Sequence, residues 1–129
     1  MKPASIWRNE PQRYRLEAGK CLNCGELHMP KRLVCDACGK REFETVKLTP
    51  KGKVITYTVV HVAPEAFRDQ SPYPVAIIEL DEGLRMLCQM ADVAPEEVRT
   101  GMRVRLETRK IRSDGEAGVI AYGPKAVPE

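Results

Sequence analysis

The sequence lacks any long apolar run. No stretch of its 129 residues approaches the roughly 18 uninterrupted apolar residues that a membrane-spanning helix needs. The opening residues 1–17 also lack an apolar core of the signal-peptide kind. The hydrophobic share is 43%, which is ordinary for a globular protein and argues against a disordered chain. We therefore expect a globular protein in the cytoplasm.

Side chains suited to nucleophilic catalysis are also scarce. The sequence has three serines, two histidines and one cysteine, Cys88, outside two CxxC pairs. None of them forms a recognisable pair of nucleophile and base, and neither common glycine-rich phosphate loop occurs. Cys88 shares one face of a predicted strand with Leu84, Met86 and Met90, which favours a buried thiol over a catalytic one. We predict no catalytic residues and a protein that is not an enzyme.

The two CxxC pairs are the strongest signal in the sequence. They consist of Cys21, Cys24, Cys35 and Cys38. Glycine follows each pair and gives the backbone freedom that a metal-binding knuckle requires. The ten residues between the pairs suffice for a β-hairpin that returns the chain to the first knuckle. The spacing predicts a rubredoxin-like zinc ribbon with one structural Zn²⁺ ion per chain.

Four thiolates complete the tetrahedron and leave no open position for an activated water, so the zinc is predicted not to be catalytic. A rubredoxin-like iron centre and a redox-active thiol pair are the alternatives for this site. His28 lies between the pairs, and we predict that it is a surface residue because the ligand set is complete without it.

The predicted organisation has three parts. Residues 1–14 form a helical segment of one or two short turns, in which Ser5 is a possible cap and Pro11 limits the length. Residues 15–50 form the zinc ribbon, entered by a strand whose apolar positions alternate from Tyr14. Residues 51–129 form a second domain. Ile6 and Trp7 are candidates for docking a partner, although Trp7 can equally pack on the ribbon of its own chain.

Five strand-like runs follow Gly52, at residues 53–62, 73–80, 84–91, 103–111 and 118–122. A tight hairpin at Asp81, Glu82 and Gly83 joins the second run to the third, and a short helical turn opens at Pro95 before the fourth. Three strands, a short helix and two strands is the order of the five-stranded OB-fold barrel. The fold class is therefore mainly β. The last residues, 123–129, are predicted to be a loose tail.

The first barrel strand has two faces that differ in character. One carries Tyr57, Val59 and His61, and the other, the better core candidate, carries Val54, Thr56, Thr58, Val60 and Val62. The loop at 63–74 adds Phe67 and Tyr73, and loops of this kind often bind ligands in OB-folds. Tyr57, His61, Phe67 and Tyr73 are therefore candidate residues for binding a cofactor. A purely structural loop, stiffened by its prolines, is an equal alternative.

Charge bears on whether the barrel binds single-stranded nucleic acid, which is the alternative function. Residues 1–50 hold ten Lys/Arg against six Asp/Glu, whereas residues 51–129 hold eleven against twelve and only four aromatic residues. This balance argues against such binding, because phosphate contacts dominate its affinity. Arg103, Arg105 and Arg109 share one strand face, which is more often a solvated surface paired with residues such as Glu107 than a phosphate-binding stripe.

The whole chain resembles the zinc-ribbon and OB-fold proteins known as domain of unknown function thirty-five. The resemblance rests on these segments: SIWRNEPQRYRLEAGKCLNCGELHMP, VCDACG, KGKVITYTVVHVAPEAF and YPVAIIELDEGLRMLCQM with the following PEEVRTGMRV. The chain looks most like archaeal members that accompany acetoacetyl-CoA thiolase and hydroxymethylglutaryl-CoA synthase.

This resemblance implies a non-catalytic bridging subunit of a complex between these two enzymes, early in the mevalonate route to isoprenoid lipids. It implies that the N-terminal helical segment and the ribbon dock on the partners. The barrel then contributes to assembly or contacts the CoA or acyl-CoA that the partner enzymes hold. The resemblance also assigns the zinc to Cys21, Cys24, Cys35 and Cys38, but it marks no CoA-contacting residues.

Overall fold

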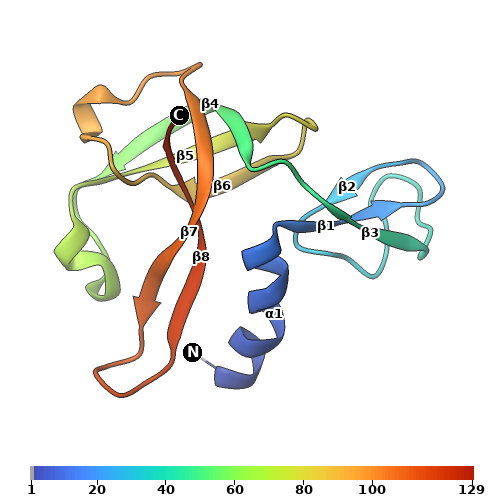
Figure 1. The fold of residues 1–129 in the computed structure, drawn as a ribbon, viewed down its shortest axis with the longest axis horizontal. Coiled ribbons are helices and arrows are strands. Elements are labelled where there is room, and N and C mark those ends of the chain that lie inside the picture. The colour runs from blue at the N-terminus through green and yellow to red at the C-terminus, as the bar shows by residue number, and fades with distance from the viewer. Residues whose placement is uncertain (1) are drawn as a thin grey trace.

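The computed structural model describes residues 2–129 and has one helix, a small three-stranded sheet and a five-stranded barrel (Figure 1). The small sheet, in the order β2-β1-β3, contains β1 (Glu17–Cys21), β2 (Leu27–His28) and β3 (Phe43–Lys47). The barrel sheet, in the order β6-β5-β4-β7-β8, contains β4 (Lys51–Val60), β5 (Tyr73–Leu80), β6 (Arg85–Gln89), β7 (Arg103–Ser113) and β8 (Ile120–Pro128). Short 3₁₀ helices, η1 (Glu65–Gln70) and η2 (Pro95–Glu97), precede β5 and β7. The fold class predicted from the sequence is confirmed: an N-terminal helix, a four-cysteine zinc ribbon and a nearly closed OB-fold barrel.

The N-terminal segment is one continuous α-helix, α1 (Pro3–Arg15), and the prediction of one or two short turns was wrong. Pro3 occupies the first turn, where its missing N–H costs nothing, and Lys2 rather than Ser5 is the N-cap. Pro11 lies inside the helix and is exposed, so its ring meets solvent while the helix continues. The helix ends at Leu16 in the left-handed conformation, and β1 begins only at Glu17 rather than near Tyr14. No helix in residues 2–129 is long and apolar enough to cross a bilayer.

The first barrel strand changes face at a β-bulge. The register of β4 against β5 shifts between Val54 and Thr56, so one extra residue reverses the inward side of the strand. Val54 is buried as predicted, but beyond the bulge Tyr57 packs against the core while Val62 is 93% exposed. The better core candidate of the two faces is therefore buried at Val54, whereas beyond the bulge the core side of the strand includes Tyr57 of the other face. A simple alternation cannot reveal such an insertion.

The C-terminal residues are a strand rather than a loose tail. β8 extends to Pro128 and pairs with β7 along its whole length, and Ala126 and Val127 are fully buried. The barrel closes where Met90 forms a parallel bridge with Ala126, and the Ala91 N–H donates to the Ala126 carbonyl at 2.8 Å. The glycine and two prolines in this segment suggested a tail, but the outer strand of a sheet tolerates them.

The ribbon and the barrel share one apolar core. Leu16 and Ala18 at the ribbon entrance and Leu48 at its exit belong to the same buried cluster as Val54 and Ile78 of the barrel. Gly52, just beyond, lies where β4 pairs with both β5 and β7, and a Cβ there would overlap the Glu79 carbonyl oxygen. The ribbon is thus held close against the barrel, and α1 lies along β8 on the same side of the molecule (Figure 1).

Candidate metal centre and interaction surfaces

The four cysteines that the sequence singles out come together at the tip of the ribbon. The sulfur atoms of Cys21, Cys24, Cys35 and Cys38 all lie within 4.8 Å of one another. Two pairs, Cys21 with Cys38 and Cys24 with Cys35, are 3.5 Å apart across the two knuckles, and none forms a disulfide. A zinc ion bonded to four sulfurs at about 2.3 Å places neighbouring sulfurs about 3.8 Å apart. The donor set therefore fits a tetrahedral zinc ion.

The two knuckles have the same backbone hydrogen bonds. In the first, the Gly25 N–H donates to the Cys21 carbonyl and the Cys21 N–H to the Glu26 carbonyl, both at 2.9 Å. In the second, the Gly39 N–H donates to the Cys35 carbonyl and the Cys35 N–H donates to the Lys40 carbonyl, also at 2.9 Å. Both glycines have positive φ, +78° and +76°, which explains why glycine follows each pair. The CxxCG pattern thus builds two matching turns that aim their sulfurs at one point.

The thiols respond to this crowding in opposite ways. The Lys40 N–H points at the Cys38 sulfur and is the main cause that lowers the pKa of Cys38 to about 6. The Glu26 N–H acts in the same direction on Cys24, but desolvation and the neighbouring sulfurs raise the pKa of Cys24 to about 12. The thiolate form is thus favoured at Cys38, whereas ionisation of Cys24 is opposed by the sulfurs around it. A divalent cation removes this conflict, because it neutralises the thiolates that bind it.

His28 is buried beside the metal centre, and the prediction of a surface position was wrong. Its side chain is 5% exposed and its ring meets that of Phe43 edge to face, with centroids 5.6 Å apart. Nε2 has no hydrogen-bond partner within residues 2–129, and the nearest Asp36 oxygen is 3.7 Å away. The position follows from the pairing of Gly19 with His28, which turns the imidazole into the small core of the ribbon. The pattern of cysteines contained no signal for this.

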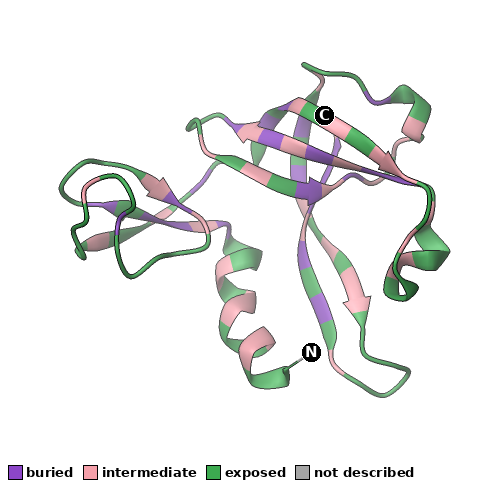
Figure 2. Cartoon of the chain, turned by 180° about the vertical axis from the view of Figure 1, so that it is seen from behind, coloured by how far each residue is buried: buried purple, intermediate pink, exposed green. Residues whose placement is uncertain are grey.

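An exposed aromatic surface lies where α1 meets the β7–β8 hairpin. Trp7 is 75% exposed, Tyr14 66% and Tyr122 42%, and all three line one shallow cavity of about 360 Å³ between α1 and the β7–β8 hairpin. Trp7 and Tyr14 are seven residues apart, two helical turns, and therefore share a face of α1. Figure 2 shows this helix beside the β7–β8 hairpin, and its residues are exposed or half-buried. We call these three residues the aromatic surface.

The sequence identified only part of this surface. Trp7 was a docking candidate, and its neighbour Ile6 is half-buried and lines an adjoining cavity towards Ile111 and Ala121. Tyr14 was assigned to a strand, and Tyr122 carried no signal, because its place beside α1 depends on the length of β8. Only the continuation of the helix through Pro11 brings Tyr14 onto the same face as Trp7.

The four candidates for cofactor binding are spread over the barrel. Phe67 of η1 and Tyr73 of β5 lie together, with ring centroids 6.0 Å apart. Tyr57 packs at the margin of the core, and His61 is exposed beyond the end of β4. Tyr73 also lines a cavity of about 650 Å³ between β6 and β8. The cavity itself had no sequence signal, because it depends on where the two ends of the sheet separate.

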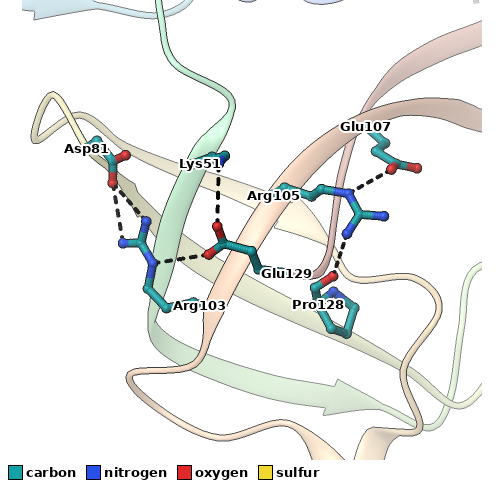
Figure 3. Close-up of polar contacts among 7 residues, drawn as sticks. All are labelled: Lys51, Asp81, Arg103, Arg105, Glu107, Pro128 and Glu129. Carbon is teal, nitrogen blue, oxygen red and sulfur yellow. Dashed lines mark hydrogen bonds and ion pairs between the residues drawn. The ribbon is translucent and has the colours of Figure 1, made fainter.

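The arginine stripe is an ion-paired outer face, as the sequence indicated. Arg103 contacts Asp81 at 3.3 Å and Glu129 at 3.4 Å, and Glu129 also meets Lys51 (Figure 3). Glu107 forms ion pairs with the other two arginines, at 2.9 Å to Arg105 and 2.7 Å to Arg109. Hydrogen bonds from Arg109 and then Arg105 lower the pKa of Glu107. The arginines are therefore neutralised by carboxylates of the same chain and are poorly available to phosphates.

The remaining thiol is a core residue. Cys88 is 7% exposed, and burial raises its pKa to about 11, against a hydrogen bond from the Ala126 backbone that lowers it. A thiol of this kind holds little thiolate near neutral pH and is a poor nucleophile. This agrees with the sequence interpretation of a buried thiol.

Comparisons with known proteins agree with this architecture. Residues 8–44 match the family described as the rubredoxin-like zinc ribbon domain of ChsH2, and residues 45–109 match its C-terminal OB-fold domain. A protein of Methanocaldococcus jannaschii named "DUF35 domain-containing scaffold protein" is 50% identical over 95% of this chain and 87% of its own length. The "Benzoylsuccinyl-CoA thiolase subunit BbsA" of Thauera aromatica is 32% identical over 83% of this chain and 73% of its own length. A solved structure described as "Ltp2-ChsH2(DUF35) aldolase" is 31% identical, covers 99% of this chain and 96% of the other, and superposes with a TM-score of 0.76.

Proposed function

Since this chain belongs to the DUF35 family of ChsH2-type zinc-ribbon and OB-fold proteins, we propose that it is a non-catalytic scaffold subunit of a thiolase complex. The name of the Methanocaldococcus relative supports the scaffold role. The name of the Thauera relative supports a thiolase as one partner. The second partner we propose is hydroxymethylglutaryl-CoA synthase, on the resemblance of the sequence to archaeal members that accompany acetoacetyl-CoA thiolase and this synthase.

The metal centre has a structural task in this proposal. Cys21, Cys24, Cys35 and Cys38 hold one Zn²⁺ ion through four thiolates, which leaves no position for a substrate or water. The ion supplies the stability that a ribbon of this size cannot obtain from its own apolar core. The rigid ribbon then fixes the direction in which α1 leaves it, because Leu16 connects the helix directly to β1.

The aromatic surface is the single observation that carries the proposal. Exposed Trp7 and Tyr14 on one helix face, extended by Tyr122 from β8, give an apolar area on a rigid support. Tryptophan and tyrosine dominate the binding energy of protein interfaces, and an exposed cluster of them marks an interaction site. The charged residues that line the same cavity are Glu10 and Arg15, so the surroundings of this apolar area carry both signs.

Transfer of acetoacetyl-CoA between the two enzymes gives the complex its purpose. The chain brings the enzymes together, so that the product of the thiolase reaches the synthase without release to bulk solvent. The barrel assists by contacting CoA or acyl-CoA held by the enzymes, with Tyr57, His61, Phe67 and Tyr73 as the candidate residues. Of these, Phe67 and Tyr73 are close enough to form one contact area.

Co-purification from the native cell tests the proposal. The chain, tagged at its C-terminus and expressed at its native level, should bring down an acetoacetyl-CoA thiolase and a hydroxymethylglutaryl-CoA synthase in fixed ratio. A tagged Trp7→Ala chain is the matched comparison and should recover less of the enzyme that meets the aromatic surface. Recovery of the wild-type chain as a clean monomer would count against the scaffold role.

A further inference from the structure

The two ends of the barrel sheet separate beside α1 and leave a groove. β6 and β8 meet at the bridge between Met90 and Ala126. Both strands run away from this point in the same direction, β6 back towards Arg85 and β8 back towards Ile120. The cavity of about 650 Å³ lies between them, and the helix residues Gln12 and Arg13 form its wall. The barrel is therefore open along most of β6.

The outer edge of β6 has unpaired main-chain groups. The Leu80 N–H donates to the Leu84 carbonyl, and the Met90 N–H donates to the Pro74 carbonyl. Because antiparallel pairing alternates along a strand, the even-numbered residues of β6 face β5, and the N–H and C=O groups of Arg85, Leu87 and Gln89 face away from it. Leu87 is also 69% exposed, unusual for a leucine in a strand. Such an edge is a template for another strand.

The opposite side of the groove is a poorer template. The main-chain groups of Ala126 point towards β6, and the main chain of Pro124, two residues earlier on β8, lies along the same edge. Proline has no N–H to donate, and natural proteins use it to block strand edges. The groove therefore offers one free edge, that of β6.

The chemistry of the groove indicates what pairs with this edge. The Oε1 atom of Gln89 is buried at the groove and has no hydrogen-bond donor within residues 2–129. Many of the other lining residues are apolar, among them Val75, Met86 and Ile111. An acyl chain alone leaves the edge groups and Gln89 unsatisfied. An extended peptide supplies alternating donors and acceptors at the spacing of the strand.

The charges around the groove select an acidic peptide. Arg13 and Arg85 line it, and an adjoining cavity of about 360 Å³ adds Lys2 and Arg112. Within residues 2–129, no Asp or Glu lines either cavity, and Lys2, Arg13 and Arg112 have no carboxylate partner. Arg85 is paired with Glu79 at 3.0 Å, as the cations of the arginine stripe are paired, whereas the other three cations are not. Uncompensated cations beside an open strand edge suit carboxylates of a partner segment.

We propose that the groove between β6 and β8 binds an extended acidic segment of a partner protein, which adds to β6 as a sixth strand of the barrel. Apolar residues of the segment enter the groove while Asp or Glu residues meet Arg13, which has no carboxylate partner within residues 2–129. This site shares Tyr122 with the aromatic surface but does not depend on which enzymes the scaffold joins, so it can be tested with the zinc-loaded chain alone.

The probe is an acetylated and amidated octapeptide in which valine alternates with glutamate, titrated into the ¹⁵N-labelled chain. We expect the amide signals of Leu87 and Gln89 to shift and their hydrogen exchange to slow, with a Kd between about 10 µM and 1 mM. The Cys88 amide, which already pairs with β5, should change little. The same peptide with lysine in place of glutamate should bind at least about tenfold more weakly.

Substitutions at two positions, Leu87 and Arg13, distinguish a peptide that pairs with β6 as a strand from one that only adheres to the surface. Leu87→Pro removes an N–H that takes no part in pairing with β5, and we expect it to weaken peptide binding at least about tenfold, whereas Leu87→Val keeps the N–H and should bind as the wild type does. Arg13→Glu, on exposed α1, should weaken binding without touching the strand. The proposal is overturned if the peptide at about 5 mM leaves both amides unchanged, or if lysine and glutamate peptides bind equally. It is also overturned if the free chain self-associates through this edge and Leu87→Pro abolishes that association, because the occupant is then a second copy.

Discussion

The Leu48 N–H donates a hydrogen bond to the Leu16 carbonyl at 2.9 Å, and this contact closes the ribbon at the point where it meets the barrel. Leu16 opens the ribbon and Leu48 ends it, and both side chains are buried, with 6% and 2% exposure. Both belong to the core that includes Val54 and Ile78 of the barrel. The ribbon and the barrel therefore share one core, to which these two leucines belong.

Leu48→Ala should destabilise the whole chain rather than the ribbon alone. Removing this buried side chain leaves a cavity between ribbon and barrel, and the free energy of unfolding should fall by about 2–5 kcal/mol. Urea unfolding followed by far-UV circular dichroism and by Trp7 fluorescence should show one transition, shifted equally in both signals. Leu33→Ala is the control, because Leu33 is 88% exposed and its loss should cost less than about 0.5 kcal/mol. Two separate transitions would contradict the shared core.

Zinc should be present at one ion per chain. Cys35 is buried in the metal centre, and Cys35→Ser should abolish tight zinc binding and unfold the ribbon. The barrel strands should remain formed but less stable, since Leu16 and Leu48 lose their fixed positions. Cys88→Ala is the control and should keep one zinc ion, because Cys88 lies in the barrel. Elemental analysis that finds iron, or a folded ribbon without metal, would refute this prediction.

Cys88 should react slowly with thiol reagents in the folded chain. Burial raises its pKa to about 11 from an ordinary value of 9.0, so the thiolate is scarce at pH 8 in the native state and more abundant after unfolding. As pH rises from 9.0 towards 11, the Cys88 thiol ionises in the unfolded state before it ionises in the native state, so the native state is destabilised. Alkylation by iodoacetamide measures the first effect. The Cys88→Ala variant should lose less stability over that pH range, and an equal loss would exclude Cys88 as the cause.

Trp7→Ala should weaken partner binding without changing the melting temperature. Trp7 is 75% exposed, so its removal costs the free chain little, whereas loss of an interfacial tryptophan costs about 2 kcal/mol or more. Binding to the purified thiolase or synthase, measured by calorimetry, should fall at least about thirtyfold for the enzyme that meets this surface. Val62→Ala, at an apolar residue that is 93% exposed, should bind as the wild type does. Unchanged affinity of Trp7→Ala for both enzymes would exclude the aromatic surface from the interface.

Single-stranded oligonucleotides should bind weakly. Arg103, Arg105 and Arg109 are already paired with carboxylates, so few counterions are released from DNA on contact. Fluorescence anisotropy with a labelled thymidine oligonucleotide should give a Kd weaker than about 1 µM at physiological salt. A salt-dependent Kd tighter than this would favour the alternative function as a nucleic-acid binder.

The sequence predicted those features that depend on local chemistry. The two CxxCG knuckles, the hairpin that ends at Gly83 and the helical turn at Pro95 all lie where expected, because each is specified by a few neighbouring residues. The OB-fold followed from the succession along the chain of three strand-like runs, a short helical turn and two further runs. These signals sufficed for the fold class.

Features that depend on contacts between distant segments could not be read from the sequence. The bulge after Val54 changes the inward face of β4 without a change in residue pattern. Pro124 and Pro128 suggested a tail, yet pairing with β7 makes the segment a strand. His28 is buried because its backbone pairs with Gly19. The free edge of β6 exists because β8 separates from β6 on the side of Ala126 that leads back towards Ile120. Each case needed the partner strand as well as the residue.

Reconstitution from three purified proteins tests the scaffold role most directly. Native mass spectrometry of the zinc-loaded chain mixed with acetoacetyl-CoA thiolase and hydroxymethylglutaryl-CoA synthase should give one assembly that contains all three. The two enzymes mixed without the chain should stay separate, and the Trp7→Ala chain should reduce the ternary assembly. If the two enzymes associate equally well without the chain, or if the chain stays monomeric in the presence of both, the account of this protein as a bridging subunit is contradicted.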